Sequence, residues 1–488
     1  MKKGYLFLCI LLDVLAVAII PLNLQFFSMP EFTSIILSLA AFAAFMAFLR
    51  TCDRRAGSVV LGILTIVCIG ISLFGTYCNP YWNSISYRKQ PDYYTDVEKV
   101  SSREAKEDLE YAMKYVKKLH PALKDEMPEE LEKQYETVLS ELEQAGEIDI
   151  CTLGRKIETV LSLLGDGHTL VRAHNREKHY LKDTEKNRQA GRTLRQVNGV
   201  ELEDLFRQNS TLYSYDAESW GMSSMKNDLL TLEGLKYLNI PVRDGVSYTY
   251  EDKEGNLETV TYGENDFITY EEYAALNRSD GETEKQPFVR YELMEEENLA
   301  LLTLDSCEYN EEYCACLREM FSEIKEKNIG NVAVDLRNNG GGSSMVANEF
   351  IRYLDVDSYQ EPTFQWRLGF FELSPSDGIS HNEKDEELLF RGKVYVLTSV
   401  NTFSSAMMFA EYIKDNRLGQ IVGEPCGNTP GGYGDIAVFK LPNSQSYMQV
   451  STKEFIRADR ECRDKLVEPD IRCSSEEALE VLYDYLAE

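Results

Sequence analysis

Three short segments of the chain combine residue types that can carry out acyl transfer. Residues 165–169 read Gly-Asp-Gly-His-Thr, at the predicted end of a helix. Residues 334–343 run from apolar residues into Arg-Asn-Asn-Gly-Gly-Gly, and residues 400–410 contain Thr-Phe-Ser-Ser-Ala. A serine can attack a carbonyl carbon when a histidine takes its proton and backbone amides hold the resulting oxyanion. These segments therefore predict the parts of such a site.

The second and third segments share one local design. In each, a predicted strand ends in a sharp turn, and a helix begins whose first N–H groups have no intrahelical acceptor. Such amides stabilise either a phosphate or an oxyanion. No Walker lysine follows the glycines, and the region is acidic, which disfavours phosphate. A lone serine at a helix start can equally be an N-cap, and a lone histidine can be structural. Their coincidence with the glycine turn favours acyl transfer.

The chain from about Ser101 to Ile471 resembles the S41 serine peptidases, the family of C-terminal processing and tricorn-type proteases. Four motifs carry the resemblance in order: Asp-Gly-His-Thr at 166–169, Asp-Leu-Arg-Asn-Asn-Gly-Gly-Gly at 335–342, Thr-Phe-Ser-Ser-Ala at 402–406, and Gly-Glu-Pro at 423–425. The resemblance implies an α/β catalytic core, a peptide or protein substrate, and no metal or organic cofactor.

The resemblance also implies roles for individual residues. Ser404 corresponds to the nucleophile, and the amide of Ser405 together with that of Gly341 or Gly342 corresponds to the oxyanion hole. Processing proteases keep a lysine base in a Gly-Lys-Gly segment, but residues 426–432 contain no lysine. His168 instead matches the base of the tricorn-like subtype.

A carboxylate should orient this histidine, and two candidates stay open. Glu461, shortly before the Val-Glu-Pro-Asp-Ile segment at 467–471, matches the glutamate that completes the tricorn-like set. Tricorn-type enzymes place a serine before the histidine to link it to that glutamate, whereas this chain has Gly167. Asp166 is therefore the competing choice, although it can also cap its own turn.

The elements that must position these residues fall into three regions outside the N-terminus. Apolar periodicity predicts helices over 101–119, 129–144 and 148–164, the first ending at His120-Pro121. Residues 190–295 alternate in short runs, with a hairpin over 246–250 and 257–262, and the resemblance suggests a PDZ-like insert there. From 298, strands at 299–304, 332–336 and 393–398 alternate with helices at 311–327, 343–354 and 402–415, which predicts an α/β core.

The N-terminus carries three apolar runs, 4–27, 32–49 and 57–77. Each is about long enough to cross roughly 30 Å of hydrocarbon as a helix. A cleaved signal peptide has one such stretch, so three membrane helices are predicted. Lys2, Lys3 and the arginines at 50, 54 and 55 place the N-terminus and the second loop in the cytoplasm, since the loop 28–31 has no cation. Everything after Tyr77 is then extracytoplasmic, with Tyr77, Tyr81 and Trp82 at the membrane interface.

Composition restricts the partners. The 488 residues carry a net charge of −30, of which residues 1–90 contribute +4, so the predicted ectodomain carries −34 and nucleic acid is a poor partner. Membrane lipid is the predicted partner of the N-terminal helices. Eleven cysteines and five histidines show no zinc-ligand spacing, while disulfide pairing and oligomeric state stay open.

These patterns divide the chain into five parts: three transmembrane helices at 1–78, a linker at 79–100, a helical subdomain with the histidine loop at 101–175, a β-rich, PDZ-like region at 176–295, and an α/β S41-like core at 296–488. The predicted function is that of a multi-pass serine endopeptidase in the cell membrane, with its catalytic domain outside the cytoplasm. The alternative is a catalytically inactive receptor that binds peptides on the same fold.

Overall fold

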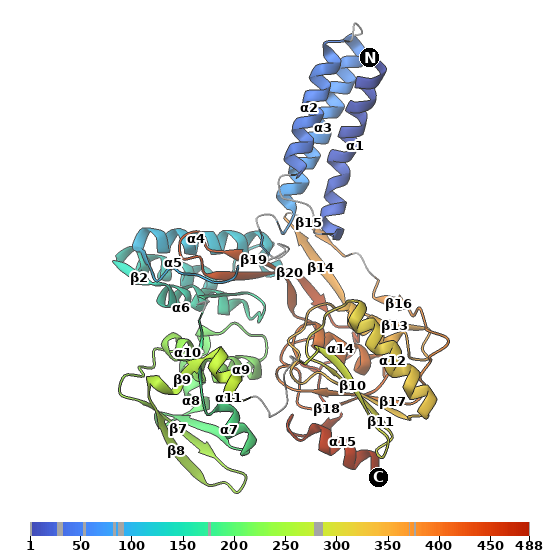
Figure 1. Ribbon diagram of the computed structural model, residues 1–488. Coiled ribbons are helices and arrows are strands. Elements are labelled where there is room, and N and C mark those ends of the chain that lie inside the picture. The colour runs from blue at the N-terminus through green and yellow to red at the C-terminus, as the bar shows by residue number, and fades with distance from the viewer. Residues whose placement is uncertain are drawn as a thin grey trace.

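The computed structural model of the protein describes residues 2–26, 33–51, 55–81, 84–85, 92–173, 177–277, 286–369, 371–374 and 377–487. The loop 28–31, Arg54 and Trp82, on which parts of the topology prediction rest, lie outside the described residues. The three predicted N-terminal helices are α1 (Lys2–Phe26), α2 (Thr33–Leu49) and α3 (Arg55–Cys78). They pack against one another as a bundle that projects from the rest of the molecule (Figure 1).

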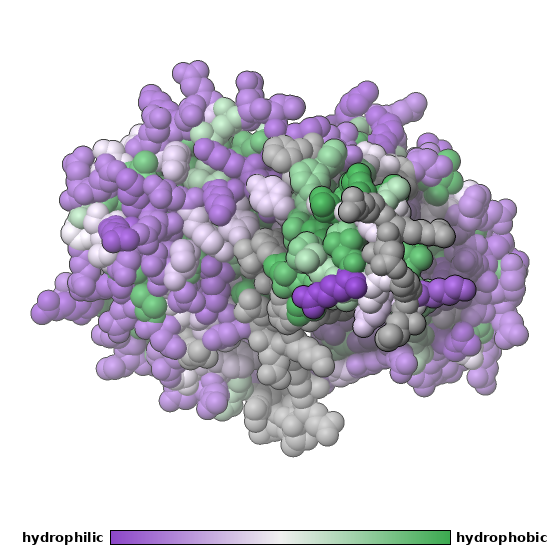
Figure 2. Space-filling view, turned by 90° about the horizontal axis from the view of Figure 1, so that it is seen from above, coloured by the Kyte–Doolittle hydropathy of each residue, from purple (hydrophilic) through white to green (hydrophobic). Residues whose placement is uncertain are grey.

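The outer face of the bundle is apolar, and some polar side chains lie between the helices beside apolar ones. Phe7, Leu39 and Ile66 are 68%, 65% and 66% exposed. Asp13 and Thr65 are buried between the helices, where the Thr65 hydroxyl donates to Asp13 Oδ2 at 2.8 Å. Seen from above, apolar residues gather on the bundle, whereas the surrounding surface is mostly hydrophilic (Figure 2). An outer face this apolar is unlike that of a water-soluble helical bundle and fits a hydrocarbon surrounding.

Two of the three helices contain a stretch that is long and apolar enough to cross a membrane, Lys3–Ile20 in α1 and Ala56–Cys78 in α3. The third, α2, is apolar but has only 17 residues. At 1.5 Å per residue its length is about 26 Å, somewhat less than a typical hydrocarbon core. The support for a membrane anchor therefore comes mainly from α1 and α3.

The helical subdomain follows the predicted periodicity. It consists of α4 (Ser102–Leu119), α5 (Glu129–Gln144) and α6 (Ile150–Leu161), joined by the short pair β1 (Lys99–Ser101) and β2 (Glu147–Asp149). Ser101 caps α4 in a capping box with Glu104, and α4 ends at His120, directly before Pro121, as the sequence predicts. The 3₁₀ turns Pro121–Leu123 and Ser162–Leu164 follow α4 and α6.

The middle region contains the predicted hairpin but is richer in helix than expected. Its sheet has the order β6-β5-β7-β8, and the tight turn between β5 and β6 places Asn198 and Gly199 at φ 50° and 76°. A PDZ-like identity is not confirmed. The elements are β4 (His179–Leu181), α7 (Thr184–Gln189), β5 (Thr193–Val197), β6 (Val200–Glu201), α8 (Leu202–Asn209), α9 (Glu218–Leu229), α10 (Leu232–Tyr237), β7 (Val246–Glu251), β8 (Leu257–Tyr262), β9 (Phe267–Thr269) and α11 (Tyr270–Leu276), with 3₁₀ turns at Ser210–Leu212 and Glu264–Asp266.

The C-terminal core is a six-stranded sheet with the order β10-β11-β12-β17-β18-β21. The edge strand β10 pairs antiparallel with β11, and the other neighbours are parallel. The strands are β10 (Val289–Met294), β11 (Leu299–Leu304), β12 (Asn331–Asp335), β17 (Lys393–Thr398), β18 (Gln420–Gly423) and β21 (Ile471–Arg472). Because β10 belongs to this sheet, the core begins before the boundary predicted at 296.

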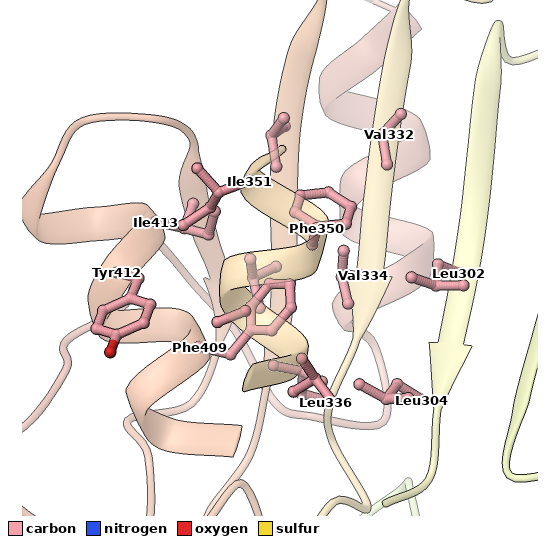
Figure 3. Packing of buried hydrophobic residues seen from close by; sticks show 14 of the residues in the cluster. Leu302, Leu304, Val332, Val334, Leu336, Phe350, Ile351, Phe409, Tyr412 and Ile413 are labelled. Atoms are coloured by element: carbon pink, nitrogen blue, oxygen red, sulfur yellow. The ribbon is translucent and has the colours of Figure 1, made fainter. Parts of the chain in front are cut away.

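Helices cover both faces of this sheet. Helices α12 (Glu311–Lys327), α13 (Met345–Ile351) and α14 (Ser405–Asp415) pack on one face, and α15 (Ala478–Ala487) packs on the other. On the first face, Phe350 and Phe409 pack against the strand residues Val334 and Leu304 in a buried cluster (Figure 3). This packing fixes the start of α14, and with it the turn that holds Ser404.

A second sheet, absent from the sequence prediction, joins the core to the helical subdomain. Its order is β15-β14-β20-β19, and β3 (Leu170–Arg172), which follows the histidine loop, pairs with β20. The other strands are β14 (Thr363–Leu368), β15 (Phe371–Leu373), β19 (Tyr433–Lys440) and β20 (Tyr447–Ile456), while β13 (Ser358–Gln360) pairs separately with β16 (Ile379–His381). Through β3 and β20, this sheet brings the histidine loop to the core.

The segment predicted as a linker is attached to this second sheet. Ile85 N–H donates to the carbonyl of Val438 in β19 at 2.7 Å, and the hydroxyl of Ser84 donates to the same oxygen at 2.9 Å. The β14–β15 hairpin in turn contacts the end of α3, where the rings of Phe74 and Phe371 meet edge to face at 6.0 Å. The end of α3 and the segment that follows it therefore both contact the folded domain.

Candidate active site

Ser404 lies in a strained turn between β17 and α14. Its φ and ψ are 56° and −124°, a region that residues other than glycine rarely adopt. Its N–H donates to Asn428 Oδ1 at 2.7 Å, and the Phe403 N–H donates to the carbonyl of Asn339 at 3.0 Å. Strain of this kind persists only where surrounding contacts enforce it, and it concentrates at functional sites.

The triple-glycine turn after β12 lies directly against Ser404. Gly341 has a φ of 104°, and a Cβ atom there would lie 2.7 Å from Ser404 Cβ and 3.0 Å from Ser405 N. Gly342 has a φ of 139°, and its Cβ would lie 2.4 Å from the Cys307 carbonyl oxygen. Both positions therefore require glycine, because the backbone approaches its neighbours too closely for a side chain.

Two amides of these turns are available as donors. The Gly341 N–H already donates to Asn339 Oδ1 at 2.9 Å. Within the described residues, the N–H groups of Gly342 and Ser405 donate to no protein acceptor, and Ser405 Oγ ties the two turns together by donating to the Gly342 carbonyl at 2.8 Å. Ser405 is also the first residue of α14, where amides have no intrahelical acceptor.

His168 lies beside the serine turn. Its ring packs against the ring of Phe403, the residue before Ser404, with centroids 4.6 Å apart, and Phe403 stacks in turn on Trp220 at 4.1 Å. The residue is 8% exposed, and neither ring nitrogen has a hydrogen-bond partner within the described part of the chain. His168 and Ser404 are thus close in the fold without a hydrogen bond between them.

A buried carboxylate, Asp166, supports the histidine loop. It is 1% exposed, its Oδ1 accepts the His168 N–H at 2.8 Å, and the same oxygen lies 3.7 Å from His168 Nδ1. Its Oδ2 accepts from the Ser451 hydroxyl at 2.7 Å and from His120 Nε2 at 3.1 Å. Asp166 therefore has no oxygen without a donor.

The hydrogen bonds of His120 indicate its tautomer. Its Nδ1 accepts the Ala122 N–H at 3.2 Å, so the proton of a neutral ring lies on Nε2 and is donated to Asp166. Burial alone would raise the pKa of Asp166, but the hydrogen bond from His120, the nearby ring of His168 and the charges of both histidines outweigh it and hold this pKa well below the usual range. Asp166 is a carboxylate at neutral pH.

Glu461 lies apart from these residues. It is exposed in the loop after β20, where its N–H donates to Asp459 Oδ1 at 2.9 Å. None of the described residues, His168 included, makes a hydrogen bond or ion pair with its carboxylate. The structure thus brings Ser404, Ser405, Gly341, Gly342, His168 and Asp166 to one place and leaves Glu461 outside it.

The lysines that could replace a histidine base are engaged elsewhere. Lys414 pairs with Asp470 at 2.8 Å, Lys453 pairs with Asp435 at 2.5 Å, and Lys440 Nζ donates to the Tyr94 carbonyl at 2.6 Å.

Sequence reasoning missed His120, Ser451, Asn339 and Asn428, which position the site. His120 stands next to Pro121 and was interpreted only as the end of a helix. The asparagines lie in the glycine motif and in the segment inspected for a lysine, but nothing in the local sequence shows which backbone atom each side chain binds.

Comparison with known proteins supports this fold. Residues 298–473, which span β11 to β21, match peptidase family S41. The sequences of curated proteins give no match. Mature CPAF superimposes with a TM-score of 0.56 and 14% identity over 79% of this chain and 96% of that chain. CPAF complexed with lactacystin gives a TM-score of 0.53 and 13% identity, over 79% and 97%. At these identities the similarity is one of fold.

Proposed function

Because this chain is a member of peptidase family S41 and a serine-type peptidase, we propose that it is an endopeptidase that cleaves extended polypeptide segments with Ser404 as nucleophile. The observation that carries the proposal is the strained turn of Ser404, which lies against the glycine turn and beside the buried ring of His168. No metal or organic cofactor takes part in the proposed reaction.

The proposed reaction uses the free groups of the site. Ser404 Oγ attacks the substrate carbonyl carbon while His168 Nε2 takes its proton, and the N–H groups of Ser405 and Gly342 hold the oxyanion. His168 then gives the proton to the leaving amine, and water releases the acyl group by the same steps. Because His168 and Ser404 share no hydrogen bond in this structure, substrate binding must bring them together, as is common for catalytic pairs.

Asp166 is the residue that we propose to orient His168, in place of Glu461. Its Oδ1 lies 3.7 Å from His168 Nδ1, so a small rotation of the ring gives a hydrogen bond and leaves Nε2 facing the serine. A carboxylate in this position stabilises the imidazolium that forms during the reaction. Glu461, in contrast, is exposed and makes no hydrogen bond or ion pair with His168 within the described residues.

The test of the nucleophile is covalent labelling by a fluorophosphonate in the detergent-solubilised protein. Ser404→Ala should abolish labelling. Ser405→Ala should retain much of it, because that residue contributes its amide, and its hydroxyl only ties the turns together. Equal loss in both variants, with both folded, would contradict the assignment of Ser404.

The same experiment distinguishes the alternative function, a catalytically inactive receptor that binds peptides. The lack of a hydrogen bond between Ser404 and His168 is the observation that favours it. A receptor would bind peptides and remain unlabelled. An enzyme would be labelled, and a substrate peptide added together with the fluorophosphonate would reduce the extent of labelling.

We further propose that the helix bundle anchors the enzyme as a multi-pass membrane protein with the catalytic domain outside the cytoplasm. The support comes from the apolar outer face of α1 and α3 and from the cations Lys2, Lys3 and Arg50. A reporter fused after Glu488 should then be active outside the cytoplasm. Protection of the domain from protease added to intact cells would contradict this topology.

A further inference from the structure

A cavity of about 450 Å³ opens beside the catalytic residues, between the helical subdomain and the middle region. Its walls come from α6, β3, α9 and α10. At one end it reaches Gly167 and Phe403, the residues that directly precede His168 and Ser404. A side chain of a polypeptide held at Ser404 can therefore enter it.

One carboxylate faces this cavity without a full set of partners. Glu158 of α6 lines the cavity and is 1% exposed. Its Oε2 accepts the Val171 N–H at 3.0 Å, but its Oε1 has no hydrogen-bond partner within the described residues. A buried acceptor left without a donor is unfavourable, so a donor from outside the chain is favoured there.

Burial raises the pKa of Glu158 and the charge of nearby Arg172 partly offsets this, but within the described residues no cation forms an ion pair with Glu158. Arg172 is held by Asp228, with Nη1 and Oδ2 3.3 Å apart, and its guanidinium lies 3.8 Å from the ring centre of Tyr237. Lys178 and Lys236 also line the cavity, but both are exposed at its rim, where water screens their charge.

The other acids are already paired. Asp228 holds Arg172 and also accepts the Tyr213 hydroxyl at 3.0 Å. Glu233 accepts both the backbone N–H and Nδ1 of His179, at 3.0 and 2.9 Å. Glu158 is thus the acidic group that remains available inside the cavity.

We propose that this cavity is a specificity pocket that takes a basic side chain of the substrate, with Glu158 as the group that binds its ammonium or guanidinium. This inference rests on the proposed peptidase function. A lysine or arginine side chain supplies the missing donor through its N–H groups, and its alkyl stem packs against the apolar residues Trp220 and Leu170 that line the cavity. Burial raises the pKa of Glu158, and an incoming cation restores the charged form.

Binding to the inactive Ser404→Ala protein tests the pocket separately from catalysis. The probes are two pools of fluorescent ten-residue peptides that differ at one fixed central position, arginine in one pool and its uncharged analogue citrulline in the other. We expect the arginine pool to bind at least tenfold more tightly. Adding Glu158→Gln should abolish that difference and leave citrulline binding within about threefold. Adding Glu233→Gln, on the same cavity but paired with His179, should preserve it.

Turnover provides the second measurement. In the active protein, Glu158→Gln should lower kcat/KM for arginine-containing peptides at least tenfold more than kcat/KM for the matching citrulline-containing peptides. Equal binding of the two pools, a preference for acidic peptides, or equal loss for both pools in Glu158→Gln would overturn the pocket assignment. Failure of the wild-type protein to be labelled would instead overturn the peptidase function.

Discussion

At the scale of single residues, the site depends on side chains that never touch the substrate. Asp166 receives donors from His120, His168 and Ser451, and this saturation keeps it charged although it is buried. A carboxylate held in this way fixes the position of the His168 loop. The charge of Asp166, and with it the pH dependence of the site, should therefore change when a donor to Asp166 is removed.

Ser451→Ala tests this dependence. The variant removes a 2.7 Å hydrogen bond from Asp166 Oδ2. With one hydrogen-bond donor fewer, the charged form of Asp166 is less stabilised, so the pKa of Asp166 should rise. We expect the acid limb of the kcat/KM profile to move to higher pH and kcat to fall up to about tenfold, with KM nearly unchanged. Ser451→Thr, which keeps the hydroxyl, should restore the profile, and an unshifted limb in Ser451→Ala would contradict the role of Asp166.

These residues also show what can be predicted from a sequence. The motif order predicts Ser404 and His168, because the chemistry requires a few residue types at recognisable turns. His120 and Ser451 are separated from Asp166 by 46 and 285 residues, so their contacts exist only once β3 has paired with β20. Glu461 follows from the resemblance alone, and within the described residues its carboxylate makes no hydrogen bond or ion pair with His168.

At the scale of elements, the long periodic helices α4 to α6 and the buried strands of the core were predictable because each has a clear repeat of apolar residues. The second sheet was not predictable, because β14, β19 and β20 mix polar and apolar residues and pair across distant parts of the chain. The middle region has short helices such as α10, with only 6 residues, whose pattern is too brief to recognise.

The glycine turn gives a prediction with a matched control. Gly341→Ala places a Cβ 2.7 Å from Ser404 Cβ, so the turn or the serine must shift. We expect fluorophosphonate labelling and turnover to fall at least about a hundredfold, roughly 2.7 kcal/mol of barrier. Gly340→Ala meets nothing within 4 Å and should stay within about threefold of wild type. If both variants lose activity to a similar degree, the loss in Gly341→Ala does not come from its contact with Ser404, and the prediction is contradicted.

Helix α14 contains the buried acid Glu411, whose carboxylate accepts the Ala458 N–H at 2.9 Å. Burial raises the pKa of Glu411 to about 8. The folded protein then binds this proton more tightly than the unfolded chain, whose glutamate pKa is about 4.3, so stability falls as the pH rises between these values.

Replacing Glu411 by glutamine should remove this loss of stability. We expect Glu411→Gln and wild type to have similar thermal midpoints at pH 5 and the variant to be clearly more stable at pH 8. The substitution removes a pH dependence of the free energy of unfolding that is at most about 1.4 kcal/mol per pH unit. Thermal unfolding of both proteins at the two pH values measures it, and parallel pH dependence would contradict the raised pKa.

At the scale of the whole molecule, charge is the dominant property. The chain has a net charge of −30, and the part after residue 90 carries −34. Such a field attracts cationic polypeptides over distances up to the Debye length, about 10 Å at 0.1 M salt. The field acts on the encounter and leaves the chemistry at Ser404 unchanged.

Salt should therefore affect substrates according to their charge. For peptides carrying several positive charges outside the specificity pocket, we expect kcat/KM to fall several-fold between about 20 and 500 mM salt. For neutral peptides of the same length it should change little, and kcat should stay constant for both. Equal salt dependence of the two classes would show that the acidic surface does not guide the substrate.

The attachment of residues 84–85 to β19, and of the β14–β15 hairpin to α3, has a consequence for which peptide bonds the enzyme can reach. A domain on a flexible linker of about 20 residues explores a radius of some 25 Å around its anchor. In the proposed membrane-anchored state, these contacts limit the movement of the folded domain relative to the bundle, so Ser404 stays within a narrow range of heights above the lipid. A peptide bond of a substrate protein that lies at another height would stay intact even when the side chains beside it fit the site. Cleavage would then depend on where the bond lies along the substrate protein.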